Sequence, residues 1–109
     1  MNRIHVGDKV RVIISDEEGR IVYECEGTDF RNVEVAIATA YAKYMGKPLP
    51  HEFHAGKSLE EDPSFFHYYK NPDSGANDIE NYSYEVNNLT KGTSARYRVN
   101  AGGHVHVID

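Results

Sequence analysis

Two segments near the N-terminus, residues 9–15 and 20–26, are rich in β-branched and aromatic residues, and four residues ending in Gly19 separate them. Strands favour such residues, and a glycine readily adopts the positive φ of a tight turn, so the pattern predicts a β-hairpin. Pairing Ser15 with Arg20 gathers six apolar side chains on one face: Val10, Val12, Ile14, Ile21, Tyr23 and Cys25. On the other face it pairs Lys9 with Glu26 and Arg11 with Glu24. We expect this register because a slip by one residue would turn every apolar side chain to the wrong face.

The hydrophobic period changes directly after the hairpin. Apolar residues then recur at the spacing of one helical stripe: Val33, Ala36, Ile37, Ala40, Tyr41 and Tyr44. This spacing predicts an amphipathic helix that lies on a sheet. Thr28, Asp29 or Asn32 is expected to cap its start, and Gly46 followed by Pro48 is expected to end it.

The last third of the chain predicts a three-strand meander over residues 82–90, 93–100 and 104–108, with turns at 91–92 and 101–103. Pairing Thr90 with Thr93 places two apolar pairs on one face, Tyr84 with Val99 and Val86 with Tyr97. Pairing Asn100 with His104 adds Val105 and Val107 to that face. The opposite face then carries polar residues, with three side by side across neighbouring strands: Glu85, Arg98 and His106.

Together these segments predict one α+β domain over residues 1–109. It would have two layers, an antiparallel sheet (the N-terminal hairpin plus the C-terminal meander) and one long amphipathic helix on one face. Asp62 and Pro63 suit the start of a short second helix at 64–70 in the middle loop. That helix would carry four aromatic residues, Phe65, Phe66, Tyr68 and Tyr69, which could cover the core, stack on a planar ligand or form an oligomer contact.

Composition narrows the functional classes. The net charge of −5 argues against bulk nucleic-acid binding, and the single cysteine, Cys25, excludes an intramolecular disulfide. No apolar run reaches the length of a membrane span, and the first residues do not resemble a secretory signal, so we expect a soluble cytoplasmic protein without membrane partners. A hydrophobic content of 39% with eight tyrosines suggests a thin core and a homo-oligomer.

The polar face of the meander is the main candidate site, and six residues contribute to it: Glu85, Asn87, Arg96, Arg98, His104 and His106. An ordinary solvent-exposed face of an antiparallel sheet would carry the same kinds of polar residues without any function. The functional interpretation is a non-enzymatic module that binds an anionic or nucleotide-like ligand, or a protein partner, without a cofactor. Phosphate or carboxylate would be bound by Arg96 and Arg98. Further hydrogen bonds would come from Asn87, His104 and His106. The four aromatic residues of the middle loop would stack on a planar part of the ligand.

Three alternatives stay open. A carboxylate, an imidazole and two guanidiniums on a sheet (Glu85, His106, Arg98 and Arg96) resemble the catalytic set of small microbial ribonucleases of the barnase type. This resemblance covers only the last third of the chain and would imply metal-independent cleavage of RNA. His104 and His106 are also spaced to share a metal ion, with a third ligand from His51, His54 or Glu85. Finally, the acidic charge would suit an inhibitor that occupies a basic groove of another protein.

Overall fold

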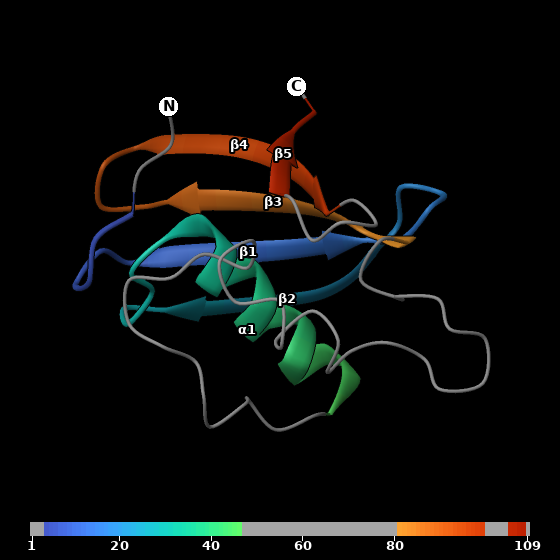
Figure 1. Ribbon diagram of the computed structural model, residues 1–109, viewed down its shortest axis with the longest axis horizontal. Helices are drawn as coiled ribbons and strands as arrows, with labels where there is room; N and C mark the ends of the chain where they lie inside the picture. Colours follow the sequence, from blue (N-terminus) through green and yellow to red (C-terminus); the bar gives the residue numbers. More distant parts are fainter. Residues whose placement is uncertain (1–3, 47–80, 100–104, 109) are drawn as a thin grey trace.

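The computed structural model describes residues 4–46, 81–99 and 105–108. These residues form an α+β fold with one helix and a five-stranded antiparallel sheet of order β2-β1-β3-β4-β5 (Figure 1). The elements in chain order are β1 (Val10–Ser15), β2 (Ile21–Gly27), α1 (Val33–Met45), β3 (Ser83–Asn88), β4 (Thr93–Val99) and β5 (Val105–Val107). The predicted α+β class, the hairpin, the helix and the meander are therefore confirmed.

The N-terminal hairpin and the C-terminal meander form one sheet because β1 pairs with β3 along its whole length. Val12 lies between Cys25 of β2 and Val86 of β3, and all three side chains belong to the face that packs on the helix. Val10, Val12 and Ile14 are fully buried, as are Tyr84 and Val86. The centre of the core is thus the inner face of β1 and β3.

The predicted register of the first hairpin is wrong by two residues, and the predicted faces are correct except at the start of β2, where Val22 and not Ile21 packs against the core. Arg11 lies opposite Glu26 instead of Glu24, and Ile14 lies opposite Tyr23 instead of Ile21. The register is also irregular between Ile14 and Ser15, and the side chain of Ile21 is 61% exposed. The turn explains the shift, since Asp16 Oδ1 accepts 2.9 Å hydrogen bonds from the backbone amides of Glu18 and Arg20.

The register of β3 and β4 also differs by two residues from the prediction, because the turn is longer. Asn88 pairs with Thr93 across a four-residue turn, and Asn88 Oδ1 accepts a 3.0 Å hydrogen bond from the amide of Lys91. Glu85 therefore lies opposite Arg96 and not beside Arg98. The predicted register of β4 with β5 is confirmed, and it sets Arg98 opposite His106.

Helix α1 begins after Asn32, whose Oδ1 accepts a 2.8 Å hydrogen bond from the amide of Val35, so Asn32 is the cap among the three predicted candidates. It ends at Gly46, which has a φ of 69°. The predicted stripe faces the core: its four central members are buried and its end members, Val33 and Tyr44, pack partly buried against it.

Among the described residues, helix α1 packs on only part of the sheet. Helix α1 packs mainly against β1, β2 and β3, whereas the inner face of β4 and β5 extends beyond it. A helix is about 10 Å wide, and five strands at about 4.8 Å spacing are nearly twice as wide. Val107 on β5 is consequently 55% exposed, although it has the same face as buried Tyr97 and Val99.

The predicted second helix at 64–70 and its aromatic residues lie outside the described residues. Within the part of the chain that is described, no helix is both long and apolar enough to cross a bilayer.

Candidate functional site

The sheet offers two candidate surfaces, one on each side of β4 and β5. We call the side that faces away from α1 the outer face. It carries Arg11, Glu85, Asn87, Arg96, Arg98 and His106. We call the hollow between α1 and the inner face of β4 and β5 the inner cleft.

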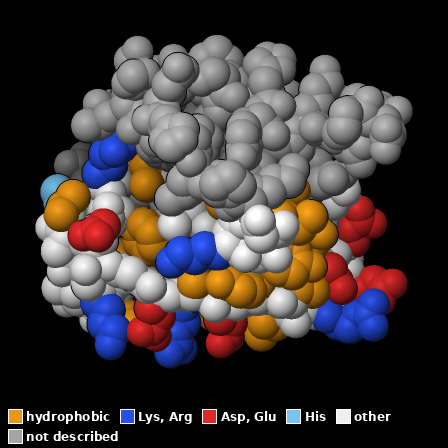
Figure 2. All heavy atoms as spheres, turned by 90° about the horizontal axis from the view of Figure 1, so that it is seen from below, with side chains coloured by type: hydrophobic (Ala, Val, Ile, Leu, Met, Phe, Trp, Pro, Cys, Tyr) orange, Lys and Arg blue, Asp and Glu red, His pale blue; other side chains and the backbone are white. Residues whose placement is uncertain are grey.

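Charges on the outer face are unevenly paired. At the β2 edge, the Arg11 guanidinium lies 2.8 Å from the Glu26 carboxylate, and Lys9 Nζ lies 3.7 Å from it. These cations lower the pKa of Glu26, chiefly through the hydrogen bond from Arg11. Figure 2, which looks toward β2 and α1, shows acidic and basic side chains next to each other along the border of the sheet, below an apolar band. Such exposed pairs neutralise that edge but contribute little stability.

At the opposite edge, Arg98 and His106 are register partners on β4 and β5, and both side chains are exposed. Neither forms an ion pair with any described residue. Directly opposed residues on antiparallel strands have Cβ atoms about 5 Å apart, so one small anion can contact both side chains. The sequence prediction that these two residues share a face is confirmed.

The remaining described members of the predicted site lie nearer the middle of the sheet. Asn87 donates a 3.1 Å hydrogen bond from Nδ2 to Glu85 Oε2, which fixes the carboxylate on β3. Because Glu85 faces Arg96 across the strand pair, Arg96 has a carboxylate neighbour that Arg98 lacks. The two arginines therefore differ in their surroundings: Arg96 lies opposite a carboxylate, which the predicted register had placed beside Arg98.

Five predicted site residues cannot be placed: His104 and the aromatic residues Phe65, Phe66, Tyr68 and Tyr69 lie outside the described residues, as do His51 and His54. No group of three His, Cys, Asp or Glu side chains suited to a metal ion occurs among residues 4–46, 81–99 and 105–108. The outer face is therefore built, as far as it is described, from the donors Arg98, His106 and Arg96 with Glu85 and Asn87 beside them.

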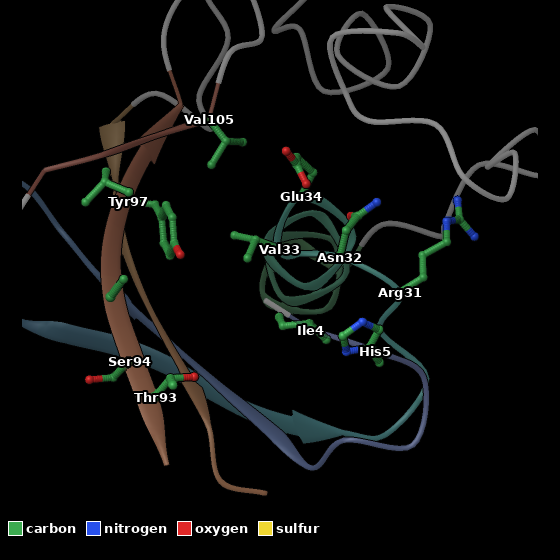
Figure 3. A pocket seen from close by; sticks show the side chains of 12 residues that line it. Ile4, His5, Arg31, Asn32, Val33, Glu34, Thr93, Ser94, Tyr97 and Val105 are labelled. Atoms are coloured by element: carbon green, nitrogen blue, oxygen red, sulfur yellow. The ribbon is translucent and has the colours of Figure 1, made fainter. Parts of the chain in front are cut away.

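The inner cleft has a volume of about 800 Å³ and lies between the start of α1 and strands β4 and β5. Apolar side chains face each other across it, with Tyr97 and Val105 on the sheet side and Val33 and Ile4 on the other (Figure 3), and half of its twelve lining residues are polar or charged. Glu34 lies on the helix at the side nearer Val105. Cavities of this size and lining are typical of small-molecule sites.

Three charged or titratable residues border the inner cleft, and two of them are engaged elsewhere. His5 contacts the Lys91 ammonium through Nδ1, and Lys91 Nζ in turn lies 3.2 Å from Asp8 Oδ2. The Arg31 side chain extends away from the hollow (Figure 3) and has interactions of its own. Glu34 makes no ion pair within the described part of the chain. The cleft therefore presents one carboxylate above apolar walls.

Sequence reasoning missed this cleft. One signal was present in the sequence. It predicts five strands, the last of which still carries valines, but only one long helix to cover them. A sheet with more apolar strands than its helix can cover must expose or otherwise fill the difference.

Comparisons with known proteins give no relative. No family model matches the chain, and neither a curated protein nor a solved structure is significantly similar to it.

Proposed function

We propose that this protein is a non-enzymatic binding module that recognises an anionic group through Arg98 and His106 at the β5 edge of the outer face. The observation that carries the proposal is the register of β4 and β5, which opposes two exposed donors that have no acidic partner among the described residues. A guanidinium presents a rigid fork of donors that matches phosphate or carboxylate oxygens. Placement on paired strands fixes the donors better than a loop would.

In this proposal the ligand is a phosphate- or carboxylate-bearing small molecule, or an acidic segment of a protein partner. The aromatic residues of the predicted 64–70 helix would provide the stacking wall for a nucleotide-like ligand. The protein would act in the cytoplasm, as a homo-oligomer and without a cofactor.

The positions of Glu85 and His106 favour binding over RNA cleavage. Glu85 pairs with Arg96, whereas His106 lies two strands away and opposite Arg98. Two strand spacings are about 10 Å, so both side chains would have to extend toward each other to reach one phosphate. A general acid and a general base must both come within hydrogen-bond reach of the reacting phosphate.

Pyrophosphate is a suitable probe for the outer face, with thermal unfolding as the readout. At about ten times its Kd it should stabilise the protein by about 1.4 kcal/mol, which corresponds to a shift of several degrees in Tm. Arg98→Gln should abolish that shift. Arg20→Gln, which removes an exposed arginine from the β1–β2 turn, is the matched control and should retain it.

An unchanged pyrophosphate response in both Arg98→Gln and His106→Gln would exclude the outer face as the site. Incubation of the protein with single-stranded RNA separates the cleavage alternative. Cleavage that disappears in Glu85→Ala would replace the binding proposal with a catalytic one.

A further inference from the structure

We propose that the inner cleft is a second binding site, which takes an apolar amine: a compound with a hydrocarbon or aromatic body and one cationic amino group that pairs with Glu34. This site lies on the opposite side of the sheet from Arg98 and His106 and takes a ligand of opposite charge. It does not depend on the function proposed for the outer face.

The apolar body of the ligand would lie against the inner face of β4 and β5, with which α1 has fewer contacts than with β1, β2 and β3. Alternation along these strands sends Tyr97 and Val105 into the cleft, and Val33 and Ile4 approach from the helix side (Figure 3). Val107 extends the same wall toward solvent and is 55% exposed. Tyr97 and Ile4 are each only 5% exposed and form the buried floor of the two walls, whereas Val33 and Val105 are partly exposed. A ligand would therefore remove from water mainly the surface of Val33, Val105 and Val107, which is the main driving force for small-molecule binding.

Charge complementarity selects a cation. Glu34 borders the cleft in the first turn of α1. The lysine and the histidine at the other side already contact each other, and the Arg31 side chain extends away. Among the described residues, an ammonium at Glu34 would therefore meet one carboxylate and no opposing cation, whereas a carboxylate ligand would be repelled. The net charge of −5 acts in the same direction.

Three small probes of one shape and different charge test the assignment: phenethylamine, phenethyl alcohol and hydrocinnamate. Each has about ten non-hydrogen atoms, so dissociation constants in the millimolar range are expected. Amide chemical shifts of the full-length protein report where each probe binds. Phenethylamine should shift the amides of Val33, Tyr97 and Val105 and should bind about fivefold more tightly than the alcohol.

Two variants separate the charge from the apolar walls. Glu34→Gln should bring the amine to within about twofold of the alcohol. Val107→Ser should weaken both probes by a similar factor, because it removes only apolar contact. Glu24→Gln removes an equal charge from an exposed position on β2, opposite Ile13, and should leave the preference for the amine intact.

Three results would overturn the proposal. The first is the absence of saturable shifts around the cleft with phenethylamine up to about 50 mM, a concentration well above the expected Kd. The second is a preference for the amine that survives Glu34→Gln. The third is tighter binding of hydrocinnamate at the same amides. Hydrocinnamate shifts confined to the amides of Arg98 and His106 would report binding at the outer face. The test of the cleft is therefore separate from the test of the outer face.

Discussion

Replacing Ile14 or Ile21 by alanine removes the same three carbon atoms from two neighbouring strands and should have very different effects. Ile14 is fully buried in the centre of the sheet, whereas Ile21 is 61% exposed because the register is irregular between Ile14 and Ser15. Burial of a methylene is worth about 0.8 kcal/mol, so the transfer contribution at Ile14 is about 2.4 kcal/mol. The cavity left under the helix raises the expected loss for Ile14→Ala to about 3–4 kcal/mol.

At Ile21 only about two-fifths of the side chain is covered and no cavity can form, so Ile21→Ala should cost about 1 kcal/mol. Urea unfolding followed by circular dichroism measures the difference. With an m-value of about 2 kcal/mol/M, the midpoints of the two variants should differ by about 1 M. The simple hairpin register, in which Ile21 opposes Ile14 in the core, predicts equal losses. Equal midpoints would therefore refute the shifted register and the position given to Ile21.

Four further predictions concern the loops, the ends of strands and the helix start. Asn88 is 1% exposed and donates a 2.9 Å hydrogen bond to Asp8, so Asn88→Ala should cost about 1–3 kcal/mol in urea unfolding. That hydrogen bond is the main cause that lowers the pKa of Asp8 below its usual 3.8. Asp8 therefore stabilises the fold above pH 3.8, and this contribution is lost as the pH falls through the pKa of Asp8 in the folded protein. Asp8→Asn should consequently make the urea midpoint depend less on pH in the acid range. A Cβ at Gly27 would lie 2.9 Å from the ring of Phe30, so Gly27→Ala should displace that ring, lower the Tm and reduce the free energy of unfolding by about 1–3 kcal/mol. Asn32→Ala should reduce the free energy of unfolding by about 1 kcal/mol, because it removes the cap of α1.

Strand faces were predictable from the sequence, whereas two of the three predicted registers were not. The face of a side chain follows from alternation and is unchanged by a slip of two residues, so Val12 and Val86 were assigned to the core correctly. Ile21 is the exception, because the irregularity between Ile14 and Ser15 changes the register there by a single residue. The slip itself depends on turn chemistry. Asp16 and Asn88 each accept hydrogen bonds from backbone amides within their turns, which lengthens the turns beyond the shortest possible connection.

The candidate site was predictable to the same extent. The partnership of Arg98 and His106 followed from the glycine turn and is confirmed, whereas the pairing of Glu85 depended on the wrong register. The inner cleft was missed because it arises from the difference in width between helix α1 and the five described strands, which shows only when the elements are considered together. Neither the helix nor any strand has an unusual sequence at that place.

The order of the strands connects the two proposed sites. Because β1 pairs with β3, the acidic hairpin is placed at one edge of the sheet and β4 and β5 at the other. At the hairpin edge Glu26 neutralises Arg11, and helix α1 covers the inner face. Among the described residues, the strands at the other edge have neither compensation: Arg98 and His106 are exposed on the outer side, and Val105 and Val107 are partly or largely exposed on the inner side. Both proposals therefore assign function to strands β4 and β5, where the described part of the sheet exposes cationic donors on one side and apolar side chains on the other.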